Sequence, residues 1–434
     1  MMKRLLAIPI LTGVLLPAQI AVKNQGYVPF SEEPILYRSS EVRDLVAQLQ
    51  ARLKSGQASL RYEQGHGYLR SVLEQLHVPV SSQTLVFSKT SFQYRKITPQ
   101  APRALYFNDD VYVGQVHDGK VLEFVSFDPM QGAIFYILDE QQKDRPVFER
   151  AELDCTQCHV AAGTRNVPGV LLRSIFTTPS GNQAARTPAY ITGHESPLAE
   201  RWGGWYVTGA LGNQRHMGNA LVTDKEHPDQ IDREAGANLT DLSKFIDTSS
   251  FLSPKSDVVA HLVLAHQTQM HNLITLTNYE TRIAAYKEAA PAAWQKPADE
   301  LVRYLLFADE AALTGKITGD TSFPQEFAAL GPRDARDRSL RDFDLEKRIF
   351  RYPCSYLIYS AAFDSIPEPA RSYIWHKLLN VLTGKDQSPA FGRISAGDRG
   401  AVLEILLATK AGLPDEWKNY RPQSLQQTAT KKGH

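Results

Sequence analysis

The sequence is poor in cysteine, balanced in charge and without a long apolar run after its first residues. It has 3 Cys among 434 residues, too few for a disulfide-stapled scaffold, and the count is odd. Lys and Arg number 48 against 47 Asp and Glu. This balance gives no support for a basic surface of the kind that nucleic-acid binding needs, so no nucleic-acid partner is expected. Hydrophobic residues make up 43% and charged residues 22%, which is typical of a soluble globular protein.

The N-terminus has the pattern of an export signal. Lys3 and Arg4 precede the apolar run 5–16, and the small residue Ala18 follows it. This order is typical of a secretory signal peptide, to which we assign residues 1–21. The alternatives are an uncleaved anchor and a buried first helix, but the run is too short to span a bilayer as a stable helix. The pattern predicts a periplasmic protein without stable membrane insertion after signal cleavage.

Two of the three cysteines lie in one short string, Cys155-Thr156-Gln157-Cys158-His159. Thiols three residues apart share one helical turn, where they can reach the two vinyl groups of a porphyrin and form thioethers. The adjoining imidazole of His159 can then bind the iron as its proximal ligand. The string therefore predicts one covalently attached haem c with its iron.

Three other interpretations of the string are weaker. A structural zinc site normally takes four Cys or His ligands in spaced pairs, and the sequence has no second pair. A thioredoxin-like dithiol follows a strand in a βαβ unit, which the segment 150–153 does not suggest. A disulfide between Cys155 and Cys158 leaves the adjoining His159 unexplained.

At Cys155, Cys158 and His159 the chain resembles the c-type cytochromes. The resemblance covers the segment around these residues and not the rest of the chain. It implies haem maturation outside the cytoplasm, in agreement with the signal peptide. The function expected is electron transfer with a redox partner protein.

The second axial ligand decides what such a haem does. A Met ligand gives an electron carrier of raised potential, whereas an open position permits ligand binding or peroxide chemistry. We favour Met217, because the glycines around it let the backbone approach a porphyrin closely. His216 and an open iron are alternatives, and His194, His266 and Met270 are weaker candidates. Filling of a core gap is the structural explanation for Met217.

Other polar groups are assigned structural roles. A zinc site from the three histidines of 261–271 fails, because spacings of five residues place side chains about 140° apart around a helix. Cys354 is expected to be a buried thiol. Asp109-Asp110 is expected to form a turn between strands and not a catalytic pair.

The predicted fold class is α+β, with a β-rich N-terminal region followed by a mainly α-helical haem-binding region. Short β-prone runs between 84 and 137, separated by turn signals, predict strands and a hairpin across 113–122. Caps and helical periodicity predict the helices. Their expected ranges are 41–53, 69–76, 256–290, 297–313, 338–350, 370–383 and 397–410.

These patterns divide the chain into regions. Residues 22–145 form a mixed region with short antiparallel strands, 146–255 the cytochrome c-like haem-binding region, 256–420 a helical region and 421–434 a disordered tail. A simple carrier needs only about 100 residues. A second function therefore stays open: a peroxidase-like, haem-dependent periplasmic oxidoreductase in which Arg215 or His216 assists at an open iron.

Overall fold

The computed structural model describes residues 27–420. The predicted signal peptide and the predicted tail lie outside the described residues. The α-helices are α1 (Leu45–Lys54), α2 (Leu69–Gln75), α3 (Glu152–His159), α4 (Val258–Tyr286), α5 (Ala292–Leu305), α6 (Phe323–Ala329), α7 (Ala361–Asp364), α8 (Ala370–Leu382), α9 (Ala396–Thr409) and α10 (Asp415–Lys418). The strands are β1 (Thr84–Val86), β2 (Arg103–Phe107), β3 (Val111–Val116), β4 (Val121–Asp128), β5 (Gly132–Asp139), β6 (Phe148–Arg150), β7 (Arg173–Ile175), β8 (Ala189–Ile191) and β9 (Trp205–Tyr206).

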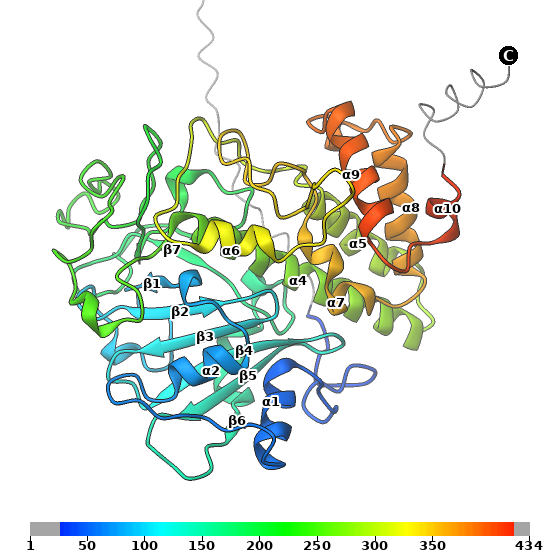
Figure 1. Ribbon diagram of the computed structural model, residues 1–434. Helices are drawn as coiled ribbons and strands as arrows, with labels where there is room; N and C mark the ends of the chain where they lie inside the picture. Colours follow the sequence, from blue (N-terminus) through cyan, green and yellow to red (C-terminus); the bar gives the residue numbers. More distant parts are fainter. Residues whose placement is uncertain (1–26, 421–434) are drawn as a thin grey trace, which may run out of the picture.

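The predicted α+β class is confirmed, with a sheet built first and most of the helix content after it (Figure 1). Seven antiparallel strands form one sheet in the order β6-β5-β4-β3-β2-β1-β9. The predicted hairpin is present, since Gln115 pairs with Leu122 across it. The turn before it is present too, because the Asn108 side chain accepts hydrogen bonds from the backbone N–H groups of Asp110 and Val111. β7 and β8 form a separate two-stranded sheet.

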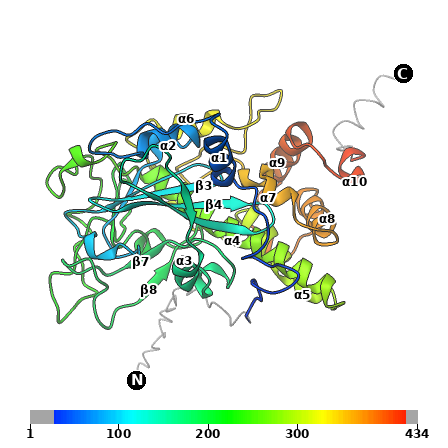
Figure 2. The same cartoon turned by 90° about the horizontal axis from the view of Figure 1, so that it is seen from below.

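The two faces of the large sheet bury different sets of side chains. Successive residues of a strand point to opposite faces. On β5, Ile134, Tyr136 and Leu138 pack in a core with α1 and α2, whereas Ala133 and Phe135 pack in a core with α4. Figure 2 shows α1 and α2 on one side of β3 and β4, and α3 on the other. The cysteine string therefore lies on the α4 side of the sheet.

α4 is the central helix, and its observed bounds lie within the predicted range 256–290. Asp257 caps its first turn by accepting hydrogen bonds from the N–H groups of Val259 and Ala260. The helix is buried on nearly all sides, because β5, α5, α6 and α7 all contact it. The helices of residues 27–420 all lack the combination of length and apolar character needed to cross a membrane.

The predicted helices 41–53, 69–76, 370–383 and 397–410 correspond to α1, α2, α8 and α9, and 297–313 overlaps α5. The predicted helix 338–350 is wrong. The Asp344 side chain accepts hydrogen bonds from the backbone N–H groups of Glu346 and Lys347, which turns the chain back and lets Phe343 pair with Phe350. Such local side-chain bonds compete with helix formation.

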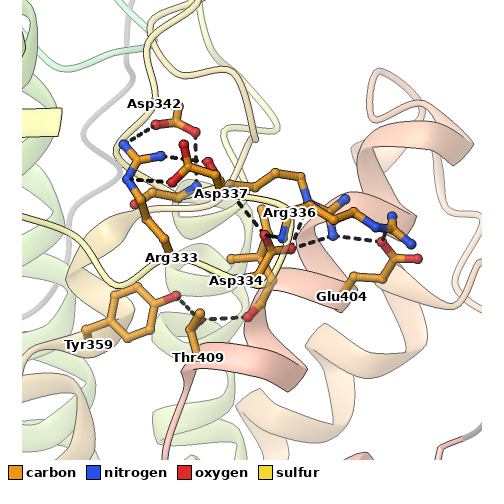
Figure 3. A network of polar contacts seen from close by, with 11 residues as sticks. Arg333, Asp334, Arg336, Asp337, Asp342, Tyr359, Glu404 and Thr409 are labelled. Atoms are coloured by element: carbon orange, nitrogen blue, oxygen red, sulfur yellow. Dashed lines mark hydrogen bonds and ion pairs between the residues drawn. The ribbon is translucent and has the colours of Figure 1, made fainter. Parts of the chain in front are cut away.

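The segment that precedes this turn is held by ion pairs instead. Arg338 pairs with Asp334 at 2.6 Å and with Glu404 of α9 at 2.8 Å. Arg333 and Arg336 add pairs to Asp342 and Glu404 (Figure 3). These charged side chains therefore connect a loop to α9.

Candidate haem-attachment site

The Cys-X-X-Cys-His string occupies α3, a short helix that directly follows the edge strand β6. The Ala151 N–H donates to the carbonyl oxygen of Phe135 at 3.0 Å, which fixes the start of α3 against β5. Cys155 is half-buried against the main core and Cys158 is exposed. The described cysteines form no disulfide. The local geometry thus places both thiols on one helix, as the spacing predicts.

His159, the last residue of α3, has a defined tautomer. Its Nδ1 lies 2.8 Å from the carbonyl oxygen of Gly169, which can only accept a hydrogen bond, so Nδ1 carries the proton. Burial lowers the pKa of His159, and the bond to Gly169 opposes that shift. The ring is therefore neutral at pH 7, with the lone pair on Nε2. This is the form in which histidine binds a metal.

The loop 160–170 closes back on the end of α3. The His159 carbonyl accepts hydrogen bonds from the Gly169 N–H at 3.0 Å and from Thr164 Oγ1 at 3.1 Å. Arg165 adopts a left-handed conformation with φ 60° and pairs with Glu300 of α5 at 2.8 Å. The imidazole and the carbonyl that orients it thus belong to one closed loop that is tied to the helical region.

The residues present fit a covalently attached haem. Two thiols and one imidazole are what the group needs from the protein, since the porphyrin brings four nitrogen ligands of its own. Within residues 27–420, no group of three or more His, Cys, Asp or Glu side chains is arranged to hold a bare metal ion. On the same helix Leu153 is 65% exposed, an apolar side chain beside the string that a bound porphyrin or a partner protein could cover.

Met217 lies in a different small cluster. It is fully buried, packs with Phe176 and Val222, and its Sδ accepts a hydrogen bond from Ser174 Oγ at 3.6 Å. None of these contacts, all among residues 27–420, involves α3. The role of Met217 as an iron ligand stays a prediction.

His216 is also engaged away from α3. Its Nδ1 accepts a hydrogen bond from the Gly218 N–H at 3.0 Å, and its ring contacts Trp202 edge to face. Burial lowers the pKa of His216 to about 4. The side chain is thus a neutral imidazole in the core. Arg215, the other group suggested for an open iron, pairs with Glu234 at 2.6 Å.

The three histidines of α4 point to three different partners. His261 Nε2 donates to the Tyr206 carbonyl oxygen at 2.9 Å, and His271 Nε2 donates to the Asp109 carbonyl oxygen at 2.7 Å. His266 Nε2 lies 2.7 Å from Ser355 Oγ. This divergence is what the spacing of five residues predicts for one helix.

A buried polar cluster around His194 was not predicted. His194 and His266 are joined through their Nδ1 atoms at 2.8 Å, and the ring of Tyr304 stacks on His194 with centroids 3.8 Å apart. The guanidinium of Arg201 is buried beside them and donates to the carbonyl oxygens of Ser196 and His194. The sequence marked His194 and His266 only as separate weak iron-ligand candidates. Nothing in it shows that they pair.

Cys354, Met270 and the neighbouring aromatic residues Trp205 and Tyr206 are all buried. Cys354 is a fully buried thiol, as expected, and burial raises its pKa. Trp205 and Tyr206 form β9 at the edge of the sheet, where Val86 and Leu85 of β1 pair with them. Met270 of α4 lies in the main hydrophobic core and has no exposed surface.

No protein-family model, curated protein or solved structure matches this chain.

Proposed function

We propose that this protein is an exported c-type cytochrome with one covalently attached haem, and that it transfers electrons to or from a redox partner protein in the periplasm. The observation that carries the proposal is the state of His159. Its Nδ1–H is held by Gly169, and its Nε2 is left to bind iron at the end of the helix that carries Cys155 and Cys158.

Each residue of the string has a distinct task in this proposal. The Cys155 and Cys158 thiols would hold the haem through thioethers, formed by adding sulfur to one carbon and hydrogen to the other carbon of each vinyl group, so that no group leaves. His159 would bind the iron. Gly169 holds the Nδ1 proton. When bound, the haem supplies one-electron exchange between the ferric and ferrous states of its iron.

A second candidate function is a haem-dependent oxidoreductase of the peroxidase type. The placement of Met217 favours it, because this side chain is buried in a separate cluster with Phe176 and Val222, where its sulfur accepts a hydrogen bond from Ser174. An iron bound by His159 alone keeps one position for a substrate such as hydrogen peroxide. The carrier and the oxidoreductase share the same attachment chemistry and differ in the sixth ligand.

Visible spectra and redox titration of the purified protein distinguish the two. A low-spin ferric spectrum with reversible one-electron reduction supports the carrier, and Met217→Leu then converts it to high-spin if Met217 is the ligand. Met270→Leu, a buried methionine of α4, is the matched control. A high-spin ferric spectrum in the unmutated protein, together with turnover of hydrogen peroxide, supports the oxidoreductase. Haem protein that shows neither reversible reduction nor peroxide turnover contradicts both.

A further inference from the structure

Two side chains on one face of α4, those of Asn272 and Gln269, form hydrogen bonds to the loop 160–170. Asn272 Nδ2 donates to the Val170 carbonyl oxygen at 2.7 Å, and the Val170 N–H donates back to Asn272 Oδ1 at 3.1 Å. One turn earlier, Gln269 Nε2 donates to the Gly163 carbonyl oxygen at 3.3 Å. Residues three apart on a helix are neighbours on its surface. The central helix of the fold thus holds the loop that follows His159 at two points, Gly163 and Val170.

The contact of Asn272 extends to the residue that orients the imidazole. A Cβ added to Gly169 would lie 2.1 Å from Asn272 Oδ1, so the amide presses directly against this part of the backbone. The carbonyl of the same Gly169 accepts the Nδ1 proton of His159, and its N–H returns to the His159 carbonyl. Asn272 is fully buried and both of its amide groups are used, so it has a single defined position.

We infer that Asn272 is a positioning residue for the iron ligand His159, an inference that rests on the haem attachment proposed above. By fixing Val170 and Gly169, it fixes the distance and direction of the hydrogen bond to His159 Nδ1. A firm bond at Nδ1 makes Nε2 a stronger donor, which favours the oxidised state of bound iron and lowers the reduction potential. Asn272 would thereby lower the potential of a bound haem through the backbone that holds His159.

The test compares Asn272→Ala with Asn278→Ala in the haem-loaded protein. Asn278 is a matched control, because it lies on the same helix, is also buried, and donates to the Ser365 carbonyl oxygen at 3.1 Å, outside the loop. The midpoint potential is measured by spectroelectrochemistry, and thermal unfolding is measured on the same samples. We expect a positive shift of the potential in Asn272→Ala and the unmutated value in Asn278→Ala.

The sign of the shift separates positioning from general damage. A loosened fold exposes the site to water, which stabilises the more highly charged ferric state and lowers the potential. Asn272→Ser, whose hydroxyl is too short to bridge both groups of Val170, decides the question if Asn272→Ala does not fold. An unchanged or lowered potential in the folded variants overturns the inference while the haem attachment stands. Absence of covalent haem from the unmutated protein overturns the proposed function and this inference together.

Discussion

His159 at the end of α3 and the pair His194–His266 in the core are two contrasting uses of histidine in one chain. All three imidazoles are neutral because burial lowers their pKa. In the core pair, neighbouring side chains stack on both rings, and both nitrogens of His266 are engaged. Within residues 27–420, His159 is hydrogen-bonded through its side chain at Nδ1 only, the residue is half-buried, and the exposed residue Cys158 lies beside it.

The difference distinguishes histidines that stabilise the fold from a histidine that is able to bind a ligand. His266, whose nitrogens are both satisfied, contributes hydrogen bonds and packing and has nothing to offer a ligand, whereas within residues 27–420 the buried Nε2 of its partner His194 has no hydrogen-bond partner. A histidine held at one nitrogen by the backbone is oriented but still able to bind. The core pair should therefore affect unfolding, and His159 should affect haem chemistry.

The largest effect on stability is expected for His266→Ala. The substitution leaves a cavity beside Phe307 and removes the partners of His194 and Ser355, which together should lower the free energy of unfolding by about 3–5 kcal/mol. Chemical denaturation measures this change. A loss below about 1 kcal/mol would show that the pair is not part of the stabilising core.

The second-largest effect is expected on the pH dependence of the free energy of unfolding, through the buried residue Glu310. Burial raises the pKa of Glu310 to about 7, while the backbone N–H of Ile349 and the charge of Arg201 oppose the shift. Between its unfolded pKa, about 4.5, and about 7, the folded state binds more protons, so this group favours folding at low pH and its contribution is lost as pH rises.

Glu310→Gln should flatten this part of the stability profile, by about 3 kcal/mol across the window. Denaturation of both proteins at pH 4.5, 6 and 8 measures the difference. Identical slopes in the two proteins would show that Glu310 titrates normally in the folded state.

The features that could be predicted from the sequence are those that depend on residues close together in the chain. The strands, the hairpin and α4 could be predicted because each depends on a local pattern of apolar residues and caps. The string Cys155–His159 is also local, since one helical turn brings its groups together. The helix expected at 338–350 failed because Asp344 bonds to its own backbone. Asn272 and the pair His194–His266 could not be predicted, because each acts on residues that are distant in the sequence.

The smallest effect on stability is expected at the candidate site itself. In protein made without haem-ligation machinery, His159→Ala removes one hydrogen bond and a partial ring contact with Phe135. The free energy of unfolding should fall by about 1–2 kcal/mol, less than for His266→Ala. Equal losses for the two substitutions would contradict the contrast drawn between them.

The most direct test of the central claim is the intact mass of the purified protein, made with a working haem-ligation system, together with a pyridine haemochrome assay. We predict one covalently bound haem per chain in the unmutated protein and in Cys354→Ala, whose thiol lies outside the string, and none in Cys155→Ala/Cys158→Ala. Unmutated protein with the mass of the bare polypeptide, or full haem retention in the double variant, would contradict the proposal.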